Sequence, residues 1–135
     1  MLDGVLIGTI RIVPMGYGLT LTEQLLPHAG PQVPVVAPGD WEVGRLVLSP
    51  DYRSDVDALR HCLQAALVHA FRHAHVARLY ATCTHVLSRL YRRFAFTAFA
   101  RDVPLAGTGK VYTMISGDAQ PVSQALSGGP LAQAH

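Results

Sequence analysis

Residues 41–48 read Trp-Glu-Val-Gly-Arg-Leu-Val-Leu, and this stretch decides the fold. Its apolar and β-branched residues predict a largely buried β-strand, which the pair Ser49-Pro50 closes. Ser54 then offers a helix N-cap, with Asp57 three residues later. Apolar residues follow at three- and four-residue steps and predict an amphipathic helix to about Arg72: Val56, Leu59, Leu63, Leu67, Ala70 and Phe71. The chain therefore contains a strand–turn–helix unit.

Further strands and helices are expected on both sides of this unit. Toward the carboxyl end the pattern predicts a strand, a helix and two β segments, at Val76–Thr82, His85–Arg93, Phe96–Arg101 and Val111–Ser116. Toward the amino end a strand, Val5–Val13, is followed by a long connection rich in Gly and Pro with a short helical candidate at Thr20–Leu26. The order β, β, α, β, α, β, β predicts an α/β fold. Residues 117–135 are small, polar and aperiodic, which predicts a flexible tail after a domain of residues 1–116.

The composition limits the class of protein. The 135 residues fit one domain, and with 50% hydrophobic and 15% charged residues the chain is globular. The mean hydropathy of +0.25 is high, but arginines interrupt every apolar stretch, so we expect no membrane span. The net charge of only +2 and the lack of a nucleic-acid-binding motif argue against DNA or RNA as a partner. Cys62 and Cys83 form no CxxC pair and no secretory signal is seen, so we expect free thiols and a cytoplasmic location.

Three segments carry a resemblance to a known superfamily. Residues 41–53 resemble the central strand and turn of the GNAT acyltransferases, in particular the branch of acyl-homoserine-lactone (autoinducer) synthases and long-chain N-acyl amino acid synthases. Gly4-Val-Leu-Ile-Gly-Thr-Ile-Arg-Ile-Val-Pro14 is similar to that branch's earlier Gly-x-x-x-Gly-x-x-Arg-Leu-x-Pro strand. Leu90-Tyr-Arg-Arg-Phe-Ala-Phe96 resembles the Tyr-x-x-x-Gly-Phe signature. The resemblance implies a GNAT-like mixed central sheet flanked by helices. It also leads us to expect a chain shortened at its amino end, because nothing before Gly4 matches the region that shapes the S-adenosylmethionine site of autoinducer synthases.

The resemblance implies an N-acyltransferase. Its acyl thioester co-substrate binds where two parallel strands separate, and the acyl group passes to the amine of an amino acid or a derivative, with no permanently bound cofactor. The superfamily's coenzyme A loop needs a glycine where this chain has Val56, beside Asp55 and Asp57. A diphosphate is poorly held there, which favours an acyl carrier protein over coenzyme A as the donor. Two alternatives stay open: an ordinary N-acetyltransferase that uses acetyl-CoA, and a non-catalytic GNAT-like module.

The resemblance also implies catalytic roles for Glu42 and Tyr91. Glu42 is expected to accept a proton from the attacking amine, and Tyr91 to protonate the leaving thiolate. The alternative for Glu42 is a structural ion pair with Arg11, and for Tyr91 a packing role inside a helix.

Six further residues are expected to bind substrate. Arg11 and Arg45 are costly in apolar strands unless paired, and a substrate carboxylate is one possible partner. A backbone N–H near Val47 is expected to polarise the thioester carbonyl, and the others lie beside the expected strand separation: Leu48, Arg53 and Thr82. His69 and His73 have a metal-ligand spacing but no third ligand, so we expect exposed histidines and no metal. Covalent catalysis by Cys83 is not expected, because no histidine can fold back onto it.

Overall fold

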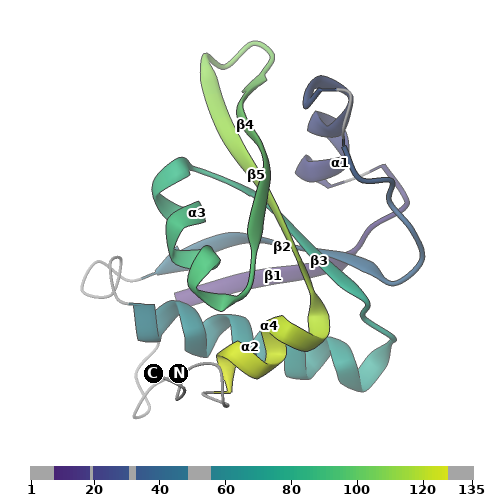
Figure 1. The fold of residues 1–135 in the computed structure, drawn as a ribbon, viewed down its shortest axis with the longest axis vertical. Coiled ribbons are helices and arrows are strands. Elements are labelled where there is room, and N and C mark those ends of the chain that lie inside the picture. The colour runs from purple at the N-terminus through teal and green to yellow at the C-terminus, as the bar shows by residue number, and fades with distance from the viewer. Residues whose placement is uncertain (1–7, 19, 31–32, 49–55, 128–135) are drawn as a thin grey trace.

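The computed structural model describes residues 8–18, 20–30, 33–48 and 56–127, without the side chains of Arg45 and Leu48. The predicted α/β class is confirmed: in these residues a mixed five-stranded sheet, in the order β1-β2-β3-β5-β4, carries helices on its faces (Figure 1). The strands are β1 (Gly8–Pro14), β2 (Asp40–Leu48), β3 (Arg78–Cys83), β4 (Thr97–Leu105) and β5 (Lys110–Asp118). The helices are α1 (Leu21–Leu25), α2 (Val56–His73), α3 (His85–Tyr91) and α4 (Ala119–Leu126), with 3-10 turns η1 (Leu26–His28) and η3 (Arg92–Phe94).

The strand predicted at 41–48 is β2, and it lies between β1 and β3. It pairs antiparallel with β1 along most of its length. The register of this pair shifts once. Thr9 pairs with Val47 and Arg11 pairs with Gly44, so two steps along β1 correspond to three steps along β2. The extra residue is a β-bulge in β2. With β3 it pairs in parallel over only three positions, from Asp40 to Glu42. Beyond Glu42 the two strands diverge, which is the separation that the resemblance implied (Figure 1).

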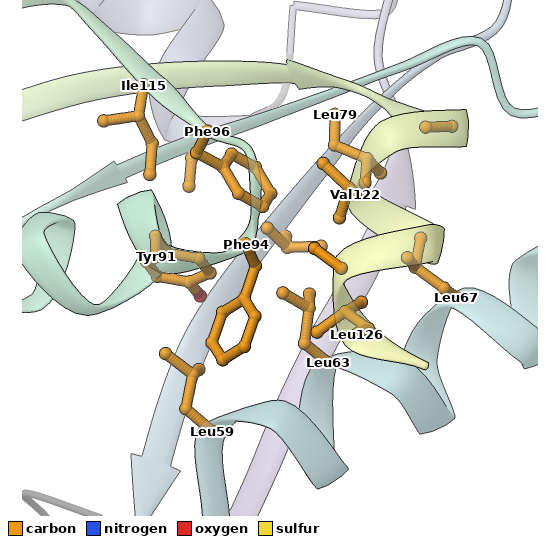
Figure 2. Packing of buried hydrophobic residues seen from close by; sticks show 14 of the residues in the cluster. Leu59, Leu63, Leu67, Leu79, Tyr91, Phe94, Phe96, Ile115, Val122 and Leu126 are labelled. Atoms are coloured by element: carbon orange, nitrogen blue, oxygen red, sulfur yellow. The ribbon is translucent and has the colours of Figure 1, made fainter. Parts of the chain in front are cut away.

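The main hydrophobic core lies between one face of the sheet and the helices α2 and α4. Figure 2 shows Leu59 and Leu63 of α2 gathered with Phe94, Val122 and Leu126. The sheet contributes its own buried side chains to this cluster, among them Val43, Leu79, Ala81 and Ile115. The residue before Ile115 in β5, Met114, points to the opposite face, as the period of two in a strand requires.

The prediction of a flexible tail is wrong for its first ten residues. Gly117 and Asp118 complete β5, and residues 119–126 form α4, with Val122 and Leu126 fully buried. Pro121 lies in the first turn of α4, where a missing N–H breaks no helical hydrogen bond. Gly117 allows this packing, because a Cβ there would lie 2.9 Å from the Ala95 carbonyl oxygen and from Val122. Residues 128–135 of the predicted tail lie outside the described residues.

The opposite face of the sheet carries α1 and a second, smaller cluster. Leu25 of α1 packs with Val103 and Met114 of the β4–β5 hairpin. Thr20, the first residue of the predicted short helix, caps α1: its hydroxyl accepts a hydrogen bond from the Glu23 N–H at 3.1 Å. The long connection before β2 therefore places a short helix on the face of the sheet that bears Glu42.

Ala95 holds a conformation that suits glycine, with a φ of +69° at the end of η3. A left-handed conformation costs a non-glycine residue about 1–2 kcal/mol, while glycine loses about 0.4–1 kcal/mol more chain entropy on folding. We therefore expect Ala95→Gly to raise the free energy of unfolding by about 0.5–1 kcal/mol in urea titrations. Ala98→Gly, in β4, is the matched control and should destabilise the protein, since glycine weakens a strand. Equal losses in both variants would contradict the strain at Ala95.

Candidate active site

The candidate site lies where β2 and β3 separate. The last paired positions are Glu42 on β2 and Tyr80 on β3. Beyond them β2 pairs with β1 only and β3 with β5 only, within the described residues. The two facing strand edges thus hold backbone N–H and C=O groups that no described strand pairs. An extended, amide-containing ligand can add to such an edge as a further strand.

Glu42 is buried at this point of separation, with 5% of its surface exposed. Its Oε2 accepts a hydrogen bond from the backbone N–H of Thr22 at 2.8 Å. The Thr22 hydroxyl in turn lies 2.8 Å from the Thr82 hydroxyl on β3. Three segments far apart in the sequence therefore meet here, and the carboxylate is fixed in one orientation.

The structural alternative for Glu42 is wrong as stated. In the part of the chain that the structure describes, Arg11 forms no ion pair with Glu42. The partner of the carboxylate is the Thr22 amide instead. Arg11 itself is half-buried and lies opposite Gly44 in the β1–β2 register, with no described side-chain partner.

The segment that supplies Thr22 is held by its own hydrogen-bond network, which the sequence interpretation missed. Glu23 Oε1 accepts from the Thr20 hydroxyl at 2.9 Å, and its Oε2 accepts from the N–H groups of Gly16 and Gly18 at 3.0 and 2.9 Å. Burial raises the pKa of Glu23, but the hydrogen bonds from Gly18, Thr20 and Gly16 outweigh it and the pKa is lowered. The signal was present as Thr20-x-x-Glu23, a capping box.

Tyr91 lies on the other face of the sheet, inside the main core. It is 1% exposed, and its ring packs edge-on against Phe96 with centroids 5.3 Å apart. In Figure 2 its hydroxyl points into the cluster. Burial raises the pKa of Tyr91 strongly, with smaller contributions from Cys83, Cys62 and Glu42. The phenol is therefore neutral at physiological pH.

Cys83 ends β3 beside the separation. Burial raises the pKa of its thiol to about 12. A thiol acts as a nucleophile through its thiolate, which is almost absent at neutral pH with such a pKa. Cys83 is therefore a poor candidate for a nucleophile.

The remaining predicted residues are only partly brought to this site. Thr82 is in place through its bond to Thr22, and Val47 is 61% exposed near the end of β2. The side chains of Arg45 and Leu48, and all of Arg53, lie outside the described residues. His69 and His73 are exposed as expected, with ring centroids 4.7 Å apart, and no third metal-ligating side chain joins them within the described ranges.

Two hollows of the surface lie away from Glu42. A groove of about 430 Å³ runs between β1 and α2 and is lined by Ile10, Arg11, Cys62 and Ala66 among others. A second of about 410 Å³ lies between the end of α2 and α4, beside Phe71 and Ala119. Neither hollow is lined by Glu42, Thr22 or Thr82, whose polar groups meet where β2 and β3 separate. No described helix is long and apolar enough to cross a membrane.

Comparison with known proteins establishes the fold. No family model matches the sequence, and no curated protein matches it significantly. Among solved structures, the chain is similar to TofI, crystallised with an inhibitor and MTA (21% identity over 90% of this chain and 62% of TofI, TM-score 0.62). It is also similar to the AHL synthase LasI, with 18% identity over 94% of this chain and 66% of LasI and a TM-score of 0.64. A third similar structure is that of BjaI, a CoA-dependent acyl-homoserine lactone synthase, with SAM and isopentyl-CoA; the identity is 19% over 92% of this chain and 60% of BjaI, with a TM-score of 0.62.

These matches are to structures longer than this chain. The chain spans 62% of TofI and 60% of BjaI, so it corresponds to less than two thirds of either protein. The chain thus has the GNAT-like fold of acyl-homoserine lactone synthases, as the three sequence segments implied.

Proposed function

We propose that this chain transfers an acyl group from an acyl thioester to the amine of an amino acid or an amino-acid derivative, as in autoinducer or N-acyl amino acid synthesis. The observation that carries the proposal is the Glu42 carboxylate, buried at the separation of β2 and β3 and oriented by the Thr22 N–H. The shared fold with acyl-homoserine lactone synthases supports the same reaction class. The free, buried thiols of Cys62 and Cys83 suit a reducing cytoplasm.

The proposed step is a direct displacement. The amine nitrogen attacks the thioester carbonyl carbon, a C–N bond forms and the C–S bond breaks. One proton passes from the amine to the Glu42 carboxylate, directly or through a water, and the departing thiolate takes up one proton. The products are an amide and a free thiol. Free strand-edge N–H groups of β2, in the region of Val47, are suited to polarise the carbonyl as charge develops on its oxygen.

Tyr91 contributes in this proposal as a hydrogen-bond donor. Its raised pKa makes it a weaker acid than an ordinary tyrosine, so complete proton transfer to a thiolate is unfavourable. A neutral phenol can still donate a hydrogen bond to the departing sulfur, and this role requires the thioester to reach the buried hydroxyl. Arg11 is the proposed partner of a substrate carboxylate, since it has no ion pair within the described chain. Arg45, Leu48, Arg53 and Thr82 remain proposed substrate contacts.

An acyl carrier protein is the proposed donor. Val56 occupies the position where the superfamily has a glycine, and it packs against the main core, so it is part of the fold. Asp57 beside it adds negative charge, which opposes a diphosphate. On α3 and η3 the exposed Val86 lies near Arg89, Arg92 and Arg93, also exposed, and such a surface suits an acidic carrier. Arg60, an arginine of α2, is engaged within the fold instead, because it bonds Asp57 and the Leu126 carbonyl.

Coenzyme A is the second candidate carrier. BjaI and MesI, which share the fold, are both described as CoA-dependent acyl-homoserine lactone synthases. The two candidates differ in charge and size, so one assay can separate them.

The test is release of free thiol from acyl thioesters in the presence of amines. We expect the chain to release thiol from acylated carrier protein when S-adenosylmethionine or a standard L-amino acid is added, with a matching amide detected by mass spectrometry. The rate should fall with added salt if carrier docking is electrostatic. Higher activity with acyl-CoA would assign coenzyme A as the donor. No amine-dependent release from any thioester would refute the proposed function and favour a non-catalytic module.

A further inference from the structure

Gly44 lies in β2 two residues after Glu42, and the fold does not explain why it is a glycine. It is not among the glycines with positive φ, so its backbone conformation is open to any residue. Among the described residues, a Cβ at this position would meet only Glu42, at 3.4 Å from Oε1 and 3.9 Å from Cδ, which is ordinary contact. Gly117, by contrast, could not accept a Cβ without a clash. A glycine inside a strand weakens it relative to alanine, and it often marks a close approach by a ligand.

The position that a side chain would take on Gly44 faces Oε1 of the Glu42 carboxylate. Residues two apart in a strand share a face, so Glu42 and Gly44 both lie on the face that bears α1. Oε2 is occupied by the Thr22 N–H, whereas Oε1 accepts no hydrogen bond from the described residues.

Two neighbours of Gly44 lie on the adjoining part of the sheet. Arg11 is the register partner of Gly44 on β1 and also lines the groove between β1 and α2, with no ion-pair partner within the described chain. Val47, past the β-bulge, is exposed.

We infer that Gly44 is a specificity-determining residue. Because it has no side chain, it leaves room for the acceptor amine to bind beside Glu42 Oε1. This inference rests on the proposed function, in which Glu42 accepts the amine proton. A side chain at position 44 would occupy the place where the substituted carbon of the amine must pass. The acyl thioester, which binds along the strand edges, would not be displaced by it.

The test compares the wild type with Gly44→Ala and Gly44→Ser in the thiol-release assay. S-adenosylmethionine and L-methionine serve as bulky amines and hydroxylamine as a small nucleophile, with the uncatalysed rate subtracted. One added methyl group in a fitted site changes discrimination by roughly tenfold or more. We expect the KM of the bulky amine to rise by about that factor in Gly44→Ala and further in Gly44→Ser. The KM of the thioester should stay the same, and hydroxylamine-dependent release should persist.

Thr97→Ala, at an exposed position of β4, is the matched control and should keep all wild-type constants. The melting temperature of Gly44→Ala should equal or exceed that of the wild type, because alanine suits a strand better than glycine. An unchanged amine KM, or equal losses for every substrate with a lower melting temperature, would overturn the inference. If the wild-type protein released no thiol with any of the three nucleophiles, the proposed function would be overturned, and the role of Gly44 in binding the acceptor would be overturned with it.

Discussion

Glu42→Gln is expected to lower kcat/KM for amine-dependent thiol release by roughly 10²- to 10⁴-fold, the usual contribution of a positioned general base. The amide keeps the shape of the side chain, and its oxygen can still accept the 2.8 Å hydrogen bond from the Thr22 N–H. It cannot take up the amine proton. The fold should therefore remain while the reaction slows. Initial rates with acylated carrier protein, and the KM of the thioester, measure the two effects separately.

Glu23→Gln is the matched control, because it makes the same chemical change in the same short region. Glu23 holds the loop before α1 through Gly16, Gly18 and Thr20 and faces no proposed reactant. This variant should lose about 1 kcal/mol of the free energy of unfolding, as expected for a weakened hydrogen-bond network, with little change in rate. Equal rate losses in both variants would show that Glu42 acts by supporting α1 and not as a base.

Leu126→Ala is expected to lower the free energy of unfolding by about 2–5 kcal/mol. Leu126 is 1% exposed in α4 and belongs to the cluster with Leu63, Phe94 and Val122, so its loss would leave a cavity in the main core (Figure 2). Urea titration followed by circular dichroism gives the value.

The control for this prediction is Gln124→Ala, an exposed position on the same helix. It should change the free energy of unfolding by no more than about 0.5 kcal/mol. If Leu126→Ala changed stability as little as Gln124→Ala, residues 119–126 would behave as the flexible tail that the sequence predicted.

Elements with a strong local signal were predictable from the sequence. The strand at 41–48 and the helix after it are confirmed with boundaries within a few residues, because β-branched runs and three- to four-residue apolar steps act locally. The turn at Gly107-Thr108-Gly109 has an equally local signal in the sequence, because both glycines adopt a positive φ that glycine readily accepts.

The last helix was missed although its signal exists. The apolar residues of α4 follow the helical spacing: Ala119, Val122, Ala125 and Leu126. Three of the eight residues of the helix are polar, however, and Pro121 lies in its first turn. Half of the helix's apolar residues are alanines, which bury little surface each. Packing against α2 and the η3 turn stabilises α4, and this contribution depends on tertiary contacts.

The sequence by itself determined the strand–helix unit around residues 41–73, the α/β class and the presence of Glu42 in a central strand, because these depend on neighbours within a few positions. Only the tertiary structure decided that Glu42 is held by Thr22, twenty residues away, and that its other oxygen faces Gly44. The reason is physical. Which groups meet across a sheet depends on strand register and on where two strands separate, and these follow from the packing of the whole core.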